Sequence, residues 1–152
     1  MTSGATSLTA AQRAELDVLL AQGVLRAVSA DLPRARDFLR HAREALEVVS
    51  RIGNNHVCFD AAYNAAHDVG EGLLASYGYR TGSGPGAHAA VGRFLEIVLT
   101  DPLGREAATA YDTLRMIRNA LRYQAKSPSR AETEVAVAVA QDLLTAARER
   151  LS

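Results

Sequence analysis

The sequence is poor in cysteine, tryptophan and aromatic residues in general. Cys58 is the single cysteine among 152 residues, which excludes a disulfide within the chain. No spacing of cysteine and histidine fits a zinc site, and we expect neither a metal nor a cofactor. Because aromatic residues make up 5% of the chain, the core has to be built mainly from alanine, leucine and valine. Small side chains let helices approach closely, which favours a helical bundle.

The sequence also lacks long apolar runs and an excess of either charge. No apolar stretch reaches the roughly 18 residues of a membrane span, and none follows a basic start as in a secretory signal. We therefore expect a soluble, cytoplasmic protein that makes no contact with a membrane. The 17 basic and 17 acidic residues cancel, so any binding of nucleic acid has to come from local charge.

The spacing of the apolar residues predicts an all-α fold, an antiparallel bundle of five to six helices with no sheet. The helices are expected over residues 9–27, 31–52, 56–77, 87–99, 101–125 and 129–150. Four of them begin at a side chain that can cap the first turn: Thr9, Asp31, Asp101 and Ser129. Residues 1–8 are polar and small and are expected to be disordered, which leaves residues 9–151 as a single domain.

Residues 111–130, which start inside the helix expected over residues 101–125, form a basic segment in an otherwise neutral chain. Between Tyr111 and Arg130 the sequence has five basic residues and one acidic residue, Asp112. At about 100° per residue, four of the basic residues fall along one side of the helix. These four are Arg115, Arg118, Arg122 and Lys126. Guanidinium groups on one face can bind phosphate through paired hydrogen bonds, so this stripe is a candidate site for an anionic ligand.

A second polar stripe lies on the helix expected over residues 56–77. Its members fall within about a quarter of the helix circumference: His56, Asp60, Asn64, His67 and Glu71. If this stripe faces the arginines, imidazole and carboxylate groups neighbour guanidinium groups in one cleft. Alternatively, the two stripes neutralise each other as ion pairs or face water. His67 and Glu71 are four residues apart, as in some metal pairs, but two ligands do not make a metal site.

Two helical segments of the sequence carry a pair of motifs. The first is Asp60-Ala-Ala-Tyr-Asn-Ala-Ala-His67, followed by Leu73-Leu74 and the turn Gly78-Tyr-Arg80. The second is Tyr111-Asp-Thr-Leu-Arg-Met-Ile-Arg-Asn-Ala-Leu-Arg-Tyr123. The pair resembles the helix motifs of the HEPN superfamily of helical domains, and the second segment is similar to the R-N-x-x-x-Y helix of that family. The three specified positions are held here by Arg118, Asn119 and Tyr123. Order and spacing agree over about residues 31–151.

This resemblance implies a bacterial protein that folds as a bundle of four or five helices and forms a homodimer. Many HEPN domains are metal-independent ribonucleases with an R-x(4–6)-H motif, in which the sites of two subunits meet across a cleft. Bacterial members often pair with a nucleotidyltransferase as toxin and antitoxin. The resemblance therefore suggests RNA or a nucleotide as ligand and a nucleotidyltransferase as partner.

The sequence departs from the ribonuclease motif after Arg118. No histidine follows within the required window, where positions 123 and 124 are tyrosine and glutamine. Two pairs on or near earlier helices match the spacing formally, Arg36 with His41 and Arg51 with His56. The reaction needs a group that transfers protons near neutral pH, which histidine does best. Tyr123 is a poor substitute, because the reference pKa of tyrosine is about 10.

Three functions follow from these observations. The missing histidine favours a non-catalytic HEPN-like module that binds RNA, a nucleotide or a partner protein. Its expected binding residues are Arg115, Arg118, Arg122, Tyr123, Asp60 and Asn64. The first alternative is a ribonuclease toxin in which Arg118, Asn119 and a displaced base, His67, are catalytic. The second alternative is a purely structural dimer or antitoxin subunit, in which the two stripes only pair with each other.

Overall fold

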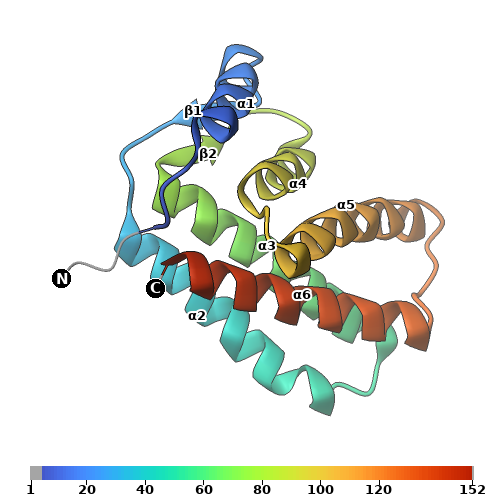
Figure 1. Ribbon diagram of the computed structural model, residues 1–152. Coiled ribbons are helices and arrows are strands. Elements are labelled where there is room, and N and C mark those ends of the chain that lie inside the picture. The colour runs from blue at the N-terminus through green and yellow to red at the C-terminus, as the bar shows by residue number, and fades with distance from the viewer. Residues whose placement is uncertain (1–4, 152) are drawn as a thin grey trace.

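Helix α3 lies in the middle of the molecule and contacts four other helices (Figure 1). The computed structural model describes residues 5–151, in which the helices are α1 (Ala10–Ala21), α2 (Leu32–Val48), α3 (Asn55–Tyr77), α4 (Ala87–Val98), α5 (Pro102–Tyr123) and α6 (Arg130–Leu151). The remaining elements are the 3-10 turn η1 (Val49–Arg51) and the strands β1 (Leu25–Ala27) and β2 (Tyr79–Thr81). The all-α class predicted from the sequence is confirmed.

Helix caps fix where the helices begin, and all four predicted caps are present. The hydroxyl of Thr9 accepts from the backbone N–H of Gln12, whose side chain accepts from the backbone of Thr9 in return. The carboxylate of Asp31 caps α2 in the same way. Asp101 caps α5 and Ser129 caps the start of α6. Each cap satisfies an amide that has no partner inside its own helix.

A two-stranded antiparallel sheet replaces the last turns of the first predicted helix, where the sequence predicted no sheet. Helix α1 ends at Ala21, and Gly23 reverses the chain with a φ of 72°. Leu25 then pairs with Thr81 and Ala27 with Tyr79. Strands of three residues are too short to show the alternation that identifies a strand in a sequence. The helix predicted over residues 31–52 also ends early, at Val48, before η1.

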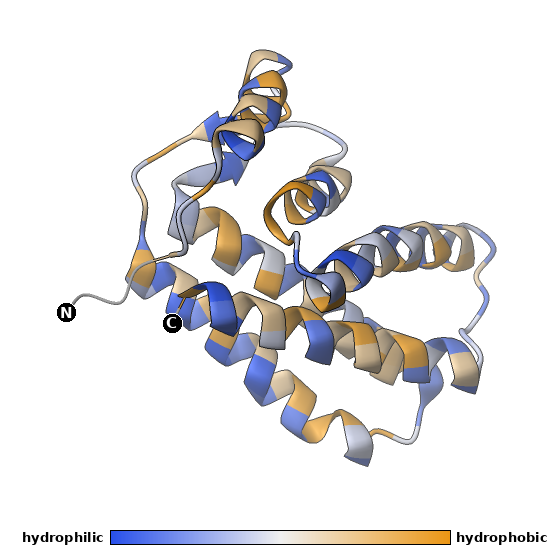
Figure 2. Ribbon diagram, viewed as in Figure 1, coloured by the Kyte–Doolittle hydropathy of each residue, from blue (hydrophilic) through white to orange (hydrophobic). Residues whose placement is uncertain are grey.

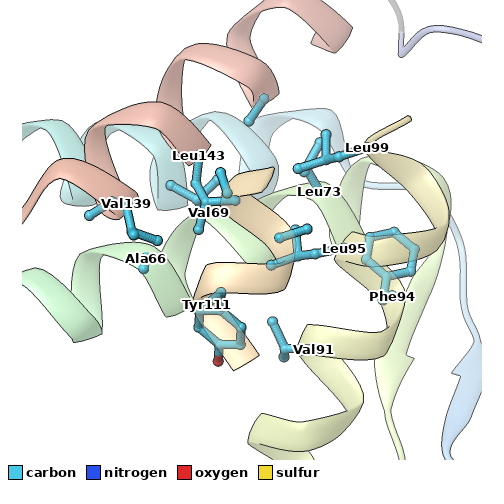
Figure 3. Close-up of a cluster of buried hydrophobic side chains, with 14 of the residues drawn as sticks. Ala66, Val69, Leu73, Val91, Phe94, Leu95, Leu99, Tyr111, Val139 and Leu143 are labelled. Atoms are coloured by element: carbon cyan, nitrogen blue, oxygen red, sulfur yellow. The ribbon is translucent and has the colours of Figure 1, made fainter. Parts of the chain in front are cut away.

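The hydrophobic core surrounds α3, and hydrophobic residues recur at helical spacing along the helices (Figure 2). Small residues of α3 allow its neighbours to come close. A Cβ atom at Gly70 would collide with Val91 of α4, and one at Gly72 would crowd the backbone of Ala35 in α2. Figure 3 shows Val91 of α4 beside Tyr111 of α5, whose hydroxyl oxygen points away from Leu143. The core is mainly aliphatic, but it also contains the two fully buried tyrosines Tyr63 and Tyr111.

The start of the described chain packs against the ends of α3 and α6. The backbone N–H of Thr6 donates to the carbonyl oxygen of Arg150 over 2.7 Å, and the hydroxyl of Tyr77 donates to the carbonyl oxygen of Thr6 over 2.6 Å. Of the segment 1–8 that we expected to be disordered, residues 1–4 lie outside the described residues and Thr6 is held by these bonds. Within the described chain, no helix has the length and apolar character that crossing a membrane requires.

Substitution of Gly78 tests how tightly the chain packs at the junction between α3 and the sheet. Gly78 ends α3 with a φ of 80°, and a Cβ atom there would lie 2.7 Å from the carbonyl oxygen of Val28. Gly23 has a similar φ of 72° but has no atom within 4 Å of an added Cβ, which makes it the matched control. We expect Gly23→Ala to lower the free energy of unfolding by about 1 kcal/mol, and Gly78→Ala by about 3 kcal/mol. Urea unfolding measures both values, and equal losses would contradict this packing.

Candidate functional site

A cleft of about 510 Å³ lies between α3, α5 and the loop that joins α5 to α6. Its lining residues are His56, Phe59, Asp60, Arg118, Leu121, Arg122, Ala125, Lys126, Ser127 and Pro128. Three of these side chains are cationic at neutral pH, and a single one is a carboxylate. We call this cavity the basic cleft. It concentrates positive charge in a chain whose net charge is zero.

The two polar stripes of the sequence meet at Asp60. Its carboxylate lies 3.8 Å from Nη2 of Arg122 and 3.6 Å from Nε2 of His56. The side chain of Arg122 is 56% exposed, so water competes with this pair and its contribution to stability is small. Asp60 therefore orients Arg122 at the cleft without using all the hydrogen-bonding capacity of the guanidinium group.

Arg118 is held in the basic cleft by an aromatic ring and not by an acid. Its Cζ lies 4.8 Å from the centre of the Tyr63 ring, an arrangement in which the cation is attracted to the face of the ring. Its Nε is buried and has no hydrogen-bond partner among the described residues. Leaving a buried donor without a partner is unfavourable by about 1–3 kcal/mol. Within the described chain, no acceptor satisfies this donor.

Behind Arg118, four rings from three helices form one hydrogen-bonded group, which we call the His–Tyr cluster. Its members are Tyr63, His67, His88 and Tyr111. The hydroxyl of Tyr63 lies 2.8 Å from Nδ1 of His88 and 3.5 Å from the hydroxyl of Tyr111. The hydroxyl of Tyr111 lies 3.0 Å from Nδ1 of His67. The two imidazole rings stack with their centres 4.0 Å apart, and Nε2 of His67 lies 3.3 Å from the carboxylate of Glu71.

Burial favours the uncharged forms of three members of the His–Tyr cluster, His88, Tyr63 and Tyr111. The pKa of His88 is lowered to about 4, mainly by burial and in addition by charge repulsion from His67 and Arg118. Burial also raises the pKa of Tyr111 above its ordinary value, and the nearby Tyr63 hydroxyl adds to this effect. The pKa of Tyr63 is raised by burial as well, against the opposing influence of Tyr111 and Arg118. Near neutral pH, both hydroxyl groups and His88 therefore carry no charge.

The structure brings some of the candidate residues together and leaves others apart. Asp60, Arg118 and Arg122 line the basic cleft, as does Lys126 of the same stripe. The remaining candidates, which do not line it, are Asn64, His67, Arg115, Asn119 and Tyr123. Arg115 is bound 2.9 Å from Asp112 on its own helix, whereas Asn64 and Asn119 are exposed. Tyr123 is 93% exposed and points away from the fold.

Three members of the His–Tyr cluster were not identified as candidates from the sequence. Tyr63 and Tyr111 lie within the two segments that resemble the HEPN motifs, but neither occupies a position that the motif specifies. His88 follows the glycine-rich loop, on a separate helix. A buried tyrosine hydroxyl needs a polar partner, and this is the signal that could have led from the tyrosines to the histidines. Among residues 5–151, no three metal-binding side chains are close enough to hold an ion.

Comparison of the chain with protein-family models, with curated proteins and with solved structures found no match. The function is therefore inferred from the residues of the basic cleft and the His–Tyr cluster. Both lie on the two helices, α3 and α5, whose sequences resemble the HEPN motifs, and α4 contributes His88.

The lowered pKa of His88 predicts a loss of stability in acid. Its value in the folded protein is about 4, below the ordinary 6.5. Neutral His88 therefore stabilises the fold fully above pH 6.5, and this contribution is lost as the pH falls from 6.5 towards 4. Because the ring is only partly buried, we expect a loss of about 1–2 kcal/mol. Urea unfolding of the wild type at pH 7, 5.5 and 4.5 measures it.

His88→Asn supplies the comparison, because its amide can reach Tyr63 but does not titrate in this range. The stability difference between wild type and His88→Asn should shrink as the pH falls. His41→Asn is the control, since His41 is exposed on α2. A difference between wild type and His88→Asn that stays constant from pH 7 to 4.5 would show that His88 is not held neutral by its surroundings.

Proposed function

We propose that the protein is a non-catalytic, HEPN-like module that binds the phosphate groups of RNA or of a nucleotide in its basic cleft. We further propose that it works in the cytoplasm, as a homodimer in a bacterial toxin–antitoxin or defence-type system. The observation that carries the binding proposal is Arg118, whose buried Nε has no partner within the described chain. A phosphate oxygen is an acceptor that satisfies this donor and matches its charge.

The other side chains of the basic cleft support an anionic ligand of nucleotide size. Arg122 and Lys126 are exposed at the cleft, where they can reach further phosphate oxygens. Arginine suits this role because its planar guanidinium group donates two parallel hydrogen bonds to one phosphate. A volume of about 510 Å³ is in the range of small-molecule sites and suits one or two nucleotides of a single strand.

The contacts of His67 support binding without catalysis. The ribonuclease alternative assigns proton transfer to this residue. Both of its ring nitrogens are engaged, Nδ1 by the hydroxyl of Tyr111 and Nε2 by the carboxylate of Glu71. His67 does not line the basic cleft. A general base must reach the proton that it removes, and neither ring nitrogen of His67 is free to do so in this arrangement.

Binding is tested with a fluorescent, single-stranded oligouridylate in an anisotropy titration. We expect Arg118→Ala to weaken binding about ten-fold, since hydrogen bonds between charged groups contribute about 1.5–3 kcal/mol. We expect the slope of log affinity against log salt to become shallower by about 1. Arg36→Ala is the matched control, because Arg36 is an exposed arginine on α2 outside the cleft. Equal weakening by both variants would reduce the interaction to general attraction by positive charge.

The same preparation separates the two alternatives from this proposal. Wild-type protein should leave the oligouridylate intact after prolonged incubation. Cleavage by clean wild-type protein that is lost in Arg118→Ala would replace the binding module with the ribonuclease toxin. Absence of binding, together with a stable homodimer or a co-purified nucleotidyltransferase, would favour the purely structural or antitoxin subunit.

A further inference from the structure

The basic cleft and the His–Tyr cluster share one side chain, Tyr63. The face of its ring carries the guanidinium group of Arg118, and its hydroxyl is hydrogen-bonded to Nδ1 of His88. Tyr63 is fully buried and is further tied to Tyr111 through its hydroxyl. Any anion that binds to Arg118 therefore lies near His88, and the buried ring of Tyr63 separates the two.

A count of the available protons indicates which ring nitrogen of each histidine carries a proton. The row His88–Tyr63–Tyr111–His67 contains three hydrogen bonds but only two hydroxyl protons. With the 3.5 Å contact between the two hydroxyls counted as a hydrogen bond, one imidazole has to donate the third proton from its Nδ1. Because Nε2 of His67 faces the carboxylate of Glu71, the proton of His67 belongs on Nε2, and its Nδ1 accepts from Tyr111. His88 is therefore the imidazole that carries its proton on Nδ1 and donates to Tyr63.

This assignment leaves a free basic nitrogen, Nε2 of His88. It makes no hydrogen bond with the described residues. Arg118 Nε is the one buried side-chain atom without a partner in the described chain, so Nε2 of His88 reaches solvent. A proton can be added at Nε2 without breaking any bond of the row, because the inner nitrogen already donates.

Charges on two helices decide whether that proton binds. From α3, His88 faces Tyr63, His67 and Glu71. From α5, the groups that act on it are the cations Arg115 and Arg118. Glu71 favours a charged imidazole, whereas burial, His67 and the two arginines oppose it. An anion bound to Arg118 cancels part of this opposition.

We propose that the basic cleft takes up a proton together with its anionic ligand, and that Nε2 of His88 accepts this proton. The inference rests on the proposed binding function and adds a pH response to it. The proton comes from water or buffer, an N–H bond forms at Nε2, and neutral imidazole becomes imidazolium. No other bond of the cluster changes. The ligand and the proton then each favour binding of the other, as linkage requires.

The test uses oligouridylate, because neither its phosphodiesters nor uracil change charge between pH 4.5 and 7. His56 is a second histidine and lines the cleft, so all measurements use the His56→Asn background, in which His88 is the histidine under test. If the ligand raises the pKa of His88 from about 4 by about one unit, binding at pH 4.5 is about three-fold tighter than at pH 7. Calorimetry in buffers of different ionisation enthalpy should then detect about 0.4 proton taken up at pH 5.

The matched variant is His56→Asn/His88→Asn, in which the His88-dependent part of the pH response and of the proton uptake should be absent. Binding at pH 7 with the same pH response in both proteins overturns the proton linkage and leaves the binding function intact. Failure of oligouridylate to bind at either pH overturns the binding function itself. If the double variant does not fold, NMR titration of His88 in the His56→Asn protein decides the matter. A pKa that rises when oligouridylate saturates the protein supports the linkage, and an unchanged pKa overturns it.

Discussion

The guanidinium group of Arg118 resting on the ring of Tyr63 is the contact on which the candidate site depends. A carboxylate partner takes up some of the N–H donors of an arginine and neutralises its charge, whereas a guanidinium group on an aromatic face keeps both. The ring itself cannot move aside, because Tyr63 is fully buried and its hydroxyl is bonded to His88 and near Tyr111. The His–Tyr cluster is thus the support that fixes Arg118 in the basic cleft.

The arrangement of the His–Tyr cluster depends in turn on how closely α4 packs on α3. Glycine at position 70 lets α4 approach α3, and this approach carries His88, in the first turn of α4, to the hydroxyl of Tyr63. Burial of these rings keeps both tyrosines protonated and His88 uncharged at neutral pH. The uncharged ring of Tyr63 does not compete with a ligand for Arg118, as a carboxylate in the same place would. The composition of α3 and the electrostatics of the cleft are therefore linked.

Much of the helical fold could be predicted from the sequence, because periodic apolar residues and capping side chains are local signals. The cap at Asp101 and the stripe that contains Arg118 and Arg122 follow from neighbours a few residues away. Arg115 belongs to the same stripe by spacing, yet it pairs with Asp112, three residues earlier on its own helix. Spacing predicts the side of a helix on which a residue lies, but it does not predict whether the side chain pairs with a neighbour on its own helix instead of lining a cleft.

The rest of the site depends on contacts between distant segments, which a single sequence does not encode in any short pattern. His88 meets Tyr63 through the packing of α4 on α3, and strand β1 pairs with β2 across more than 50 residues of sequence. The HEPN resemblance directed attention to Arg118, Asn119 and Tyr123, since those positions define the motif. Of the three, only Arg118 lines the cleft, because the side chains of Asn119 and Tyr123 are turned to solvent.

The most direct test of the account is the NMR signal of the Nε–Hε group of Arg118 during addition of oligouridylate. Because this donor is buried and unpaired in the free protein, its signal should show the largest change of all arginine side chains once a phosphate oxygen accepts a hydrogen bond from it. The exposed Arg36 should change little. An Arg118 signal that stays in place while the oligouridylate binds would contradict the account.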